Sequence, residues 1–363
     1  MKNNVLSRVE KLREYMRLVN CDAFVVMNDE DSNWESLYYL SGFRGTCGAL
    51  VIYADTEELI LDGRYFEQGK NQSPLKVNEM KIGVASDVCE SLKKHSAKSV
   101  LCEAEQTSHS LWKAAMPENS VWTAADDFVM NLRRTKDEDE INCIKQAAEI
   151  GAKAFLNTLD SVRAGMKEKE FEALLNYNIS MLGGETGFDM IVASGVRSSM
   201  PHGRATDKEI KRGEIVTVDY GAKVSGYFCD ITRNFVIGNA DGRAKELHDV
   251  LYQVHNGCAA ALKAGVFGSG VHELAEKMLG IYELDKYFTH GLGHGLGLSI
   301  HEYGLLSKRR KFMLKENDVL TVEPGVYIEG WGGMRLEDDY RITENGAERL
   351  TNILEQKFFE VSH

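Results

Sequence analysis

A chain of 363 residues is longer than one ordinary hydrophobic core accommodates, so two domains are expected. The formal net charge of −12 argues against a nucleic-acid-binding surface, and no apolar run approaches the length of a membrane span. The seven cysteines show no paired spacing, which indicates reduced thiols in a cytoplasmic protein rather than a disulfide framework.

Residues 1–130 alternate short apolar runs with helical patterns and are predicted to form an α/β domain. The first twenty residues contain no apolar signal core and predict an amphipathic helix. Asp55 and Thr56 separate two strand-like runs and predict a hairpin. The expected strands are 21–28, 49–54, 57–62 and 99–105, and the expected helices between them are 86–96 and 109–116.

Residues 135–360 are predicted to form a second domain, of the α+β class, that begins with a helix. Thr135 followed by Glu138 fits a capping box, and apolar residues then recur at helical spacing as far as Phe155. A pair of glycines at 183–184 is expected to end the second helix. Helices are expected at 167–182, 243–263 and 271–280, with strand-like runs between and after them that pair as long hairpins.

Two carboxylates are predicted to oppose each other in the run IVTVDYGAKVSGYFCDITRNFVI (215–237). A turn centred on Val224 and Ser225 places Asp219 directly opposite Asp230. Like charges that face each other across a pair of strands are destabilising. The arrangement therefore predicts a cation between the two carboxylates, or a proton on one of them.

A second hairpin repeats this pattern in VLTVEPGVYIEGWGGMRLEDDYRIT (319–343), whose turn is rich in glycine. Glu323 and Glu337 lie symmetrically about its centre. The proline after Glu323 cannot donate to a ladder, so Glu323 is expected at a bend or a strand edge. Nothing in the sequence opposes Asp338 and Asp339, which are expected at a solvated edge.

Three histidines and four glycines lie close together in HGLGHGLGLSIHE (290–302). His290 and His294 are four residues apart, as on one face of a helix, but the glycines between them disfavour a helix. In an extended segment these two histidines share a face. The opposite face carries glycine, which leaves room for another backbone or for a peptide substrate. His301 would point away from His294 in a regular strand, so a bend is needed to bring the two together.

The four opposed carboxylates and an imidazole provide ligands for a divalent transition metal such as manganese, cobalt, iron or zinc. Four carboxylates would over-neutralise one dication, whereas two ions that share bridging carboxylates balance the charge. The composition of the set therefore predicts a two-metal hydrolytic site. The spacing alone leaves open which of the histidines binds metal.

In order and spacing, five of these residues resemble the metal ligands of the pita-bread metallopeptidases, and most closely those of the Xaa-Pro aminopeptidase and Xaa-Pro dipeptidase (prolidase) branch. The motifs that carry the resemblance are VTVDYGAKVSGYFCDITRNF, HGLGHGLGLSIHE, TVEPGVYI, GGMRLEDDYRIT and IVASGVRSSMPHG. YYLSGFRGTCGALVI and ILDGRYFEQ are similar to the N-terminal domain of that branch. The resemblance covers essentially the whole chain. It implies a C-terminal pita-bread catalytic domain preceded by a smaller α/β domain of the creatinase type.

The resemblance implies a metal-binding role for each matching residue. The ligands of the two ions would be Asp219, Asp230, His294, Glu323 and Glu337. Asp230 and Glu337 would be shared by both ions. A water between the ions would attack the scissile carbonyl, and Glu323 would carry its proton to the leaving imino nitrogen.

The resemblance also implies residues that handle the substrate. His202 and His301 would bind it and stabilise the oxyanion, and His290 would line the pocket for the proline side. Arg335 shares a strand face with Glu337, so it is expected to orient that carboxylate and to lie beside the substrate.

The implied activity is hydrolysis of the bond between an N-terminal residue and proline, by an aminopeptidase or a dipeptidase. The implied cofactors are two divalent ions per chain, with manganese as the first choice and cobalt, zinc or iron as alternatives. The implied partners are short peptides with proline at the second position and a second copy of the chain, without nucleic acid or membrane. A non-catalytic peptide-binding protein and a metal-free C–N hydrolase of creatinase type are the alternatives, and both predict altered ligands.

After Glu302 the chain departs from the family pattern, which commonly has a proline there. The run here is HEYGLLSKRRK, so Tyr303 and the basic residues 308–311 are expected to reshape the rim of the pocket. Neither the length of the substrate nor the strictness of the proline preference follows from the sequence.

Overall fold

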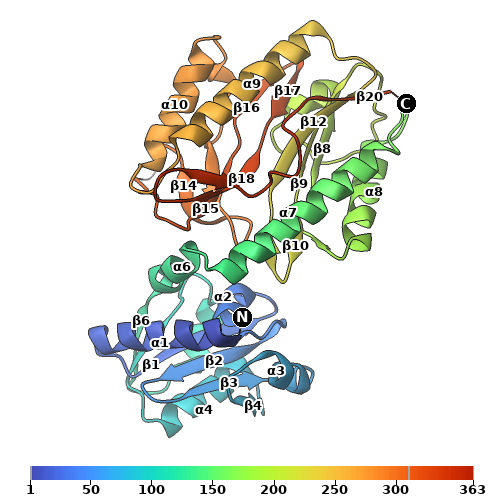
Figure 1. Cartoon of the computed structure of the whole chain (residues 1–363). Coiled ribbons are helices and arrows are strands. Elements are labelled where there is room, and N and C mark those ends of the chain that lie inside the picture. The colour runs from blue at the N-terminus through green and yellow to red at the C-terminus, as the bar shows by residue number, and fades with distance from the viewer. Residues whose placement is uncertain (1, 310, 363) are drawn as a thin grey trace. The chain divides into compact units, whose positions relative to one another are not determined.

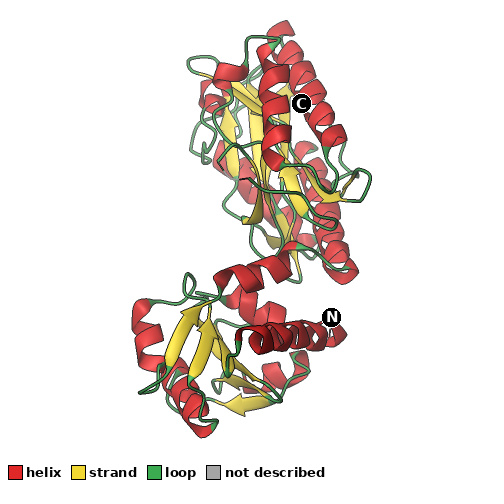
Figure 2. Ribbon diagram, turned by 90° about the vertical axis from the view of Figure 1, so that its left-hand side faces the viewer, coloured by secondary structure: helices red, strands yellow, loops and turns green. Residues whose placement is uncertain are grey.

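The computed structural model describes residues 2–309 and 311–362, and the chain divides into two compact units, Met1–Arg133 and Arg134–His363 (Figure 1). Each unit has buried hydrophobic clusters of its own. In both units, helices flank the strands (Figure 2). Across the described residues, no helix combines the length and the apolar character needed to cross a membrane.

The N-terminal unit is built on a mixed sheet with the strand order β4-β3-β2-β1-β5-β6. Its strands are β1 (Ala23–Asp29), β2 (Cys47–Tyr53), β3 (Glu57–Leu61), β4 (Val77–Glu79), β5 (Ser99–Cys102) and β6 (Val121–Ala124). Its helices are α1 (Lys2–Val19), α2 (Trp34–Ser41), α3 (Phe66–Gln72), α4 (Val84–Lys94), α5 (His109–Ala115) and α6 (Asp126–Arg134). The hairpin predicted at Asp55 and Thr56 joins β2 to β3.

Both faces of this sheet are covered, because successive residues of a strand point to opposite sides. Val25 and Met27 of β1 pack in one cluster with residues of α4 and α5. Phe24 and Val26 are equally buried on the other face, where α1 and α2 lie (Figure 1).

The C-terminal unit places two pairs of helices against sheets whose strands pair antiparallel, except that β20 lies parallel to β12. The helices are α7 (Glu138–Leu159), α8 (Glu168–Met181), α9 (Gly242–Ala261) and α10 (Gly268–Gly280), with short 3₁₀ turns η1 (Gly195–Ser199) and η2 (Asp285–Tyr287). The strands of the first half are β7 (Glu185–Thr186), β8 (Ile191–Ser194), β9 (Ile215–Tyr220), β10 (Ala222–Val224), β11 (Tyr227–Phe228) and β12 (Ile231–Ile237). Those of the second half are β13 (Gly293–Gly295), β14 (Glu302–Leu306), β15 (Val319–Val322), β16 (Gly325–Ile328), β17 (Gly332–Arg335), β18 (Asp338–Ile342), β19 (Ala347–Arg349) and β20 (Phe359–Val361).

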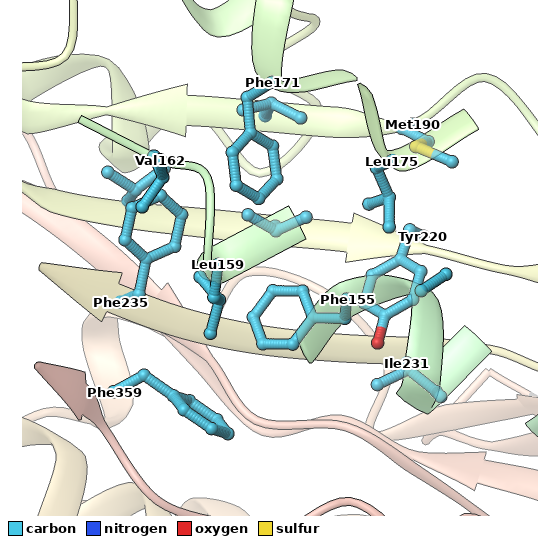
Figure 3. Close-up of a cluster of buried hydrophobic side chains, with 14 of the residues drawn as sticks. Phe155, Leu159, Val162, Phe171, Leu175, Met190, Tyr220, Ile231, Phe235 and Phe359 are labelled. Atoms are coloured by element: carbon cyan, nitrogen blue, oxygen red, sulfur yellow. The ribbon is translucent and has the colours of Figure 1, made fainter. Parts of the chain in front are cut away.

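Each helix pair covers one sheet with a cluster of apolar side chains. The pair α7 and α8 packs on the sheet β20-β12-β9-β8, where Phe155 stacks on Tyr220 and Phe171 on Phe235 (Figure 3). The pair α9 and α10 packs near the sheet β14-β13-β15-β18-β19 in a second cluster. One face of each sheet is therefore packed against a pair of helices, which holds the inner strands in place.

The first helix of this unit begins two residues later than the predicted capping box places it. Asp137 is the N-cap, its side chain accepts a hydrogen bond from the Glu140 amide, and Glu140 accepts one from the Asp137 amide. Thr135 instead forms a bridge with Asp318. The predicted box of Thr135 and Glu138 is wrong because the adjacent Asp137 and Glu140 have the same spacing and fill the two positions.

Arg233, on β12, fixes the C-terminal segment to the sheet. Its side chain is fully buried and pairs with the buried carboxylate of Asp338 at 2.7 Å. It also donates to the carbonyl oxygens of Thr232, Glu337, Leu354 and Glu355. One guanidinium thus links β12 to β18 and to the segment that leads into β20.

Replacing Arg233 with methionine is expected to lower the free energy of unfolding by about 3 kcal/mol or more. The substitution leaves the carboxylate of Asp338 buried beside unpaired carbonyl groups. Urea denaturation checks the effect, with exposed Arg163→Met as a matched control that should stay within about 0.5 kcal/mol of the unsubstituted chain. Equal stability of the two variants would contradict this role.

Candidate metal centre

The two acids of the first hairpin lie on neighbouring strands, but not in the predicted register. β9 and β12 pair so that Asp219 lies opposite Thr232, and Asp230 immediately precedes β12. The two-residue turn is Ser225–Gly226, with φ values of 50° and 85°, and not Val224–Ser225. A hairpin turn of this kind needs a left-handed backbone at both residues, which glycine adopts at no steric cost. The predicted direct opposition of the two aspartates is therefore wrong by two residues.

The second hairpin has the predicted register. β16 pairs with β17 from Gly325↔Arg335 to Ile328↔Gly332, and β15 pairs with β18 at Val322↔Asp338. Both pairings continue to a position where Glu323 faces Glu337. Glu323 lies between β15 and β16, at the interruption that the following proline predicts.

Thr232 joins the two hairpins. It pairs with Asp219 on one side and forms a bridge with Glu337 on the other. The Glu337 amide donates to the Thr232 carbonyl at 3.3 Å, and the Thr232 hydroxyl donates to the Glu337 carboxylate at 2.6 Å. The acids of two hairpins that are about a hundred residues apart in the chain are thereby brought to one place.

The histidine segment is only briefly regular. β13 covers Gly293–Gly295 and has an irregularity between His294 and Gly295, and the chain then bends through residues 297–301. This bend brings the rings of His294 and His301 edge to face, with centroids 4.3 Å apart. The convergence that the sequence allowed only with a bend is therefore present.

His294 lies among the acids. Its Nε2 is 3.5 Å from an Asp230 oxygen and 3.6 Å from a Glu323 oxygen. One ligand atom each from Asp230, His294 and Glu337 lies within 4.8 Å of the others, as a shared metal ion requires. Burial lowers the pKa of His294 to about 3, so its imidazole is neutral, which is the form that binds metal.

His290 and Arg335 are connected through Tyr327. The Nδ1 of His290 lies 2.7 Å from the Gly291 carbonyl, so it carries the proton, and its Nε2 accepts from the Tyr327 hydroxyl at 2.9 Å. Arg335 donates to the same hydroxyl at 2.6 Å and to an Asp219 oxygen at 2.5 Å. It also lies 3.8 Å from Glu337, so this guanidinium faces carboxylates of both hairpins.

Three glycines of the histidine segment let other parts of the protein approach the backbone closely. A Cβ on Gly293 would lie 1.9 Å from the Thr321 carbonyl oxygen, and one on Gly295 would lie 2.8 Å from that of Tyr303. A Cβ on Gly297 would lie 2.6 Å from a Glu302 oxygen. The expected approach of another backbone is therefore confirmed. Gly291 and Gly293 also line the pocket described below, and the use of that space by a peptide substrate stays a prediction.

All of the residues assigned to the site from the sequence line one pocket of about 530 Å³. These residues are His202, Asp219, Asp230, His290, His294, His301, Glu323, Arg335 and Glu337. Phe188, Ile191, Ile300 and Leu305 supply apolar surface on its wall.

Three carboxylate oxygens of this pocket receive no hydrogen bond from the described residues and could instead bind a cation. Asp219 Oδ1, Asp230 Oδ1 and Glu337 Oε1 are buried and have no hydrogen-bond partner among the described residues. A buried acceptor without a partner is costly, and a carboxylate more so than a neutral group. Asp189 and Arg204 also line the pocket but pair with each other. The other four carboxylates, when ionised, face only the guanidinium of Arg335, and divalent cations would neutralise the three negative charges left over.

The pKa values of these carboxyl groups are raised, as expected where negative charges outnumber positive ones. Burial, and then the charges of neighbouring carboxylates, raise the pKa of Asp230 and of Glu337 well above the ordinary range. Burial raises the pKa of Glu323 to about 7. The carboxylates are thus poorly solvated as anions, and a bound cation would restore the charged form.

Asp338 and Asp339 are fully buried, so their expected place on a solvated edge is wrong. Although burial raises it, the pKa of Asp338 is lowered overall because Arg233 pairs with this carboxylate. Asp339 accepts a hydrogen bond from the Asp230 amide at 2.9 Å and so fixes the backbone of that residue. The Arg233 guanidinium lies on β12 and the Asp230 amide lies immediately before it, and spacing along the β18 hairpin reveals neither partner.

Sequence reasoning also missed Thr232 and Tyr327. A signal was present for both, because alternate residues of a strand share a face. Thr232 is two residues after Asp230, and Tyr327 is two residues after a glycine opposite Arg335.

The residues expected to reshape the pocket rim do not line it. The Tyr303 ring packs against Phe312, and Lys308 pairs with Glu276 on α10. That expectation is wrong for both residues, and Arg310 lies outside the described residues.

Comparison with known proteins is consistent with this centre. The model of Metallopeptidase family M24 matches residues 142–344, and that of the Creatinase/Prolidase N-terminal domain matches residues 8–134. The chain is 34% identical to the Xaa-Pro dipeptidase of Pyrococcus furiosus over 349 residues, which are 95% of this chain and 97% of that protein.

Solved structures agree along the whole chain. The X-Pro aminopeptidase from Thermotoga maritima MSB8 has a TM-score of 0.91 at 39% identity, with 96% of this chain and 100% of that chain covered. The Xaa-Pro dipeptidase from Bacillus anthracis has a TM-score of 0.92 at 31% identity, with 98% and 100% covered.

The chain therefore belongs to metallopeptidase family M24 and is a peptidase. Its fold is a creatinase-type N-terminal domain followed by a pita-bread catalytic domain, as the sequence predicted. Membership of this family implies a divalent metal cofactor, which the three unpartnered carboxylate oxygens fit.

Replacing Asp230 with alanine is expected to reduce bound metal to less than one ion per chain after reconstitution with Mn²⁺ and desalting. The substitution removes the carboxylate that provides a ligand atom within 4.8 Å of those of His294 and Glu337. Elemental analysis by mass spectrometry measures the ratio. Asp189→Ala is the matched control, because this side chain lines the same pocket but is 83% exposed and pairs with Arg204. Full metal content in Asp230→Ala would refute the assignment.

Proposed function

We propose that this metallopeptidase hydrolyses the peptide bond between an N-terminal residue and proline, as an Xaa-Pro dipeptidase or aminopeptidase. The observation that carries the proposal is the set of four carboxylates and one imidazole in a single pocket, with three carboxylate oxygens unpartnered among the described residues. The names of the most similar relatives and structures support the proline preference.

The residues that would hold the metal are those of the two hairpins and the histidine segment. The proposed ligands are Asp219, Asp230, His294, Glu323 and Glu337, with Asp230 and Glu337 shared between two ions. Two divalent cations held there, with manganese as the first choice and cobalt, zinc or iron as alternatives, would acidify a water and polarise the scissile carbonyl. Arg335 holds the Asp219 carboxylate in place by donating to one of its oxygens.

Glu323 has the position for proton transfer. Its two oxygens lie 3.6 Å from His294 and 3.7 Å from His290, so it stands between the proposed metal ligand and the proposed proline side. The leaving imino nitrogen of proline must be protonated as the bond breaks. Glu323 can accept the proton of the attacking water and return it to that nitrogen.

The remaining histidines face the substrate. Burial lowers the pKa of His301, so its ring is a neutral hydrogen-bond donor when the developing oxyanion needs one. His202 lines the same pocket and is assigned the same task. His290 is held by Tyr327 on the side proposed for the proline ring.

The proposal extends to the form of the protein in the cell. We place it in the cytoplasm, which the seven unpaired cysteines support, and as a homodimer whose second subunit helps to limit substrate length. Short peptides with proline at the second position are the proposed substrates.

The deciding experiment supplies Mn²⁺, Co²⁺ and Zn²⁺ in turn and measures hydrolysis of Xaa-Pro dipeptides and Xaa-Pro-Yaa tripeptides. Cleavage of either after the N-terminal residue is expected, and the ratio of the two rates separates dipeptidase from aminopeptidase. The matched Xaa-Ala dipeptide is the control and should be cleaved more slowly. Protein that holds metal but cleaves neither proline peptide would overturn the proposal.

Replacing His301 with alanine is expected to lower kcat for an Xaa-Pro peptide by about 10²-fold, as for loss of an oxyanion donor. Bound metal should be unchanged, because the ring contacts His294 but is not among the proposed ligands. Steady-state kinetics and elemental analysis are made on the same preparation. Loss of metal from this variant would show instead that His301 is a ligand.

A further inference from the structure

Glu302, the residue after His301, folds its side chain back onto the loop that it ends. One carboxylate oxygen accepts hydrogen bonds from the amides of Leu298 and Ser299, at 2.9 and 3.2 Å. The other accepts from Lys136 Nζ at 2.9 Å. The two side chains are 4% and 1% exposed, so this ion pair lies in the interior of the C-terminal domain.

Lys136 is itself held from a distant part of the domain. Its Nζ also donates to the Arg134 carbonyl, and its amide donates to the Asn317 carbonyl. The Arg134 guanidinium makes two hydrogen bonds with the Asp318 carboxylate, at 2.7 and 2.6 Å. These contacts hold the ammonium group of Lys136 in one position, and the Glu302 carboxylate binds it there.

The loop is shaped to receive this pair. Gly297 lies where any Cβ would meet the Glu302 carboxylate at 2.6 Å and the Lys136 side chain at 2.9 Å. Its carbonyl accepts a hydrogen bond from the Phe228 amide on β11, and its own amide donates to the Ser299 carbonyl. The bend at 297–301 is therefore stabilised by the ion pair of Glu302 with Lys136 and by backbone hydrogen bonds. It also requires glycine at position 297, where a side chain would not fit.

The position of His301 depends on this bend. A regular strand would point His301 away from His294, whereas the bend brings the two rings to 4.3 Å. A buried ion pair adds little net stability over well-packed apolar residues, so placement of the loop is the effect that this pair can supply.

We propose that Lys136 and Glu302 are positioning residues that hold His301 against the substrate. Neither touches the substrate, and both act through the loop 297–302. The kinetic part of this inference rests on the proposed function, in which His301 stabilises the oxyanion.

The first test does not need catalysis. Hydrogen exchange of the Leu298 and Ser299 amides is compared in the unsubstituted protein, Glu302→Ala, Glu302→Gln and Lys136→Met, each with metal content measured. We expect exchange to rise at least tenfold in Glu302→Ala and less in Glu302→Gln, which keeps an acceptor oxygen, with metal content unchanged. Protection equal to that of the unsubstituted protein in both Glu302→Ala and Lys136→Met would overturn the proposal.

The second test is a double-mutant cycle on an Xaa-Pro peptide. Lys136→Met and Glu302→Ala are each expected to lower kcat about tenfold while KM changes less than twofold. In a His301→Ala background the same changes should lower kcat less than twofold, because the residue through which they act is gone. An undiminished loss in that background would show a merely structural role and overturn the proposal.

Two controls keep the outcomes separate. Lys145→Met removes a half-exposed ion pair with Glu348 in the same domain and should leave kcat and amide exchange within twofold. If the unsubstituted protein holds metal but cleaves no Xaa-Pro peptide, the proposed function fails, and amide exchange alone then decides whether the pair fixes the loop. Should Glu302→Ala not fold, Glu302→Gln and Lys136→Met carry both tests.

Discussion

Four carboxylates that share one buried pocket repel one another, and much of the catalytic domain is arranged to hold them there. Two hairpins supply the acids, and Thr232 joins those hairpins because it pairs with Asp219 on one side and with Glu337 on the other. Arg335 offsets part of the charge directly, and the remaining carboxylate oxygens point at the space for cations. A site built in this way is less stable empty than filled, because metal binding supplies the missing positive charge.

A second layer of charge lies behind the first. Arg233 is fully buried, pairs with Asp338 and donates to the carbonyl of Glu337, so the backbone on the C-terminal side of Glu337 is fixed. Asp339 fixes Asp230 in the same manner through its amide. In the proposed metal site, this fixed backbone would hold Asp230 and Glu337 in place when the charge between them changes during a reaction.

Predictions from the sequence were most accurate for features set by residues close together in the chain, such as a hairpin symmetric about its turn. The glycine-rich turn fixed the register of Glu323 and Glu337 correctly, whereas the turn at Ser225–Gly226 shifted Asp219 and Asp230, because side-chain spacing does not show which residue accepts a left-handed backbone. The cap at Asp137 was missed for a similar reason, since two overlapping patterns compete. Burial of Asp338 and Asp339 could not be seen at all, because Arg233 and the Asp230 amide, which bind these carboxylates, lie about a hundred residues earlier in the chain.

The three histidines of one short segment differ because the backbone between them does not repeat. Gly293 and Gly295 bring the segment against Thr321 and Tyr303, so closely that no side chain fits, and this contact sets His294 among the acids. His290 precedes the strand and is held by Tyr327. His301 is the last residue of the bend 297–301, which the Glu302 carboxylate joins to Lys136. Residue spacing alone could not separate these roles, since the contacts that fix each ring come from strands and helix ends elsewhere in the chain.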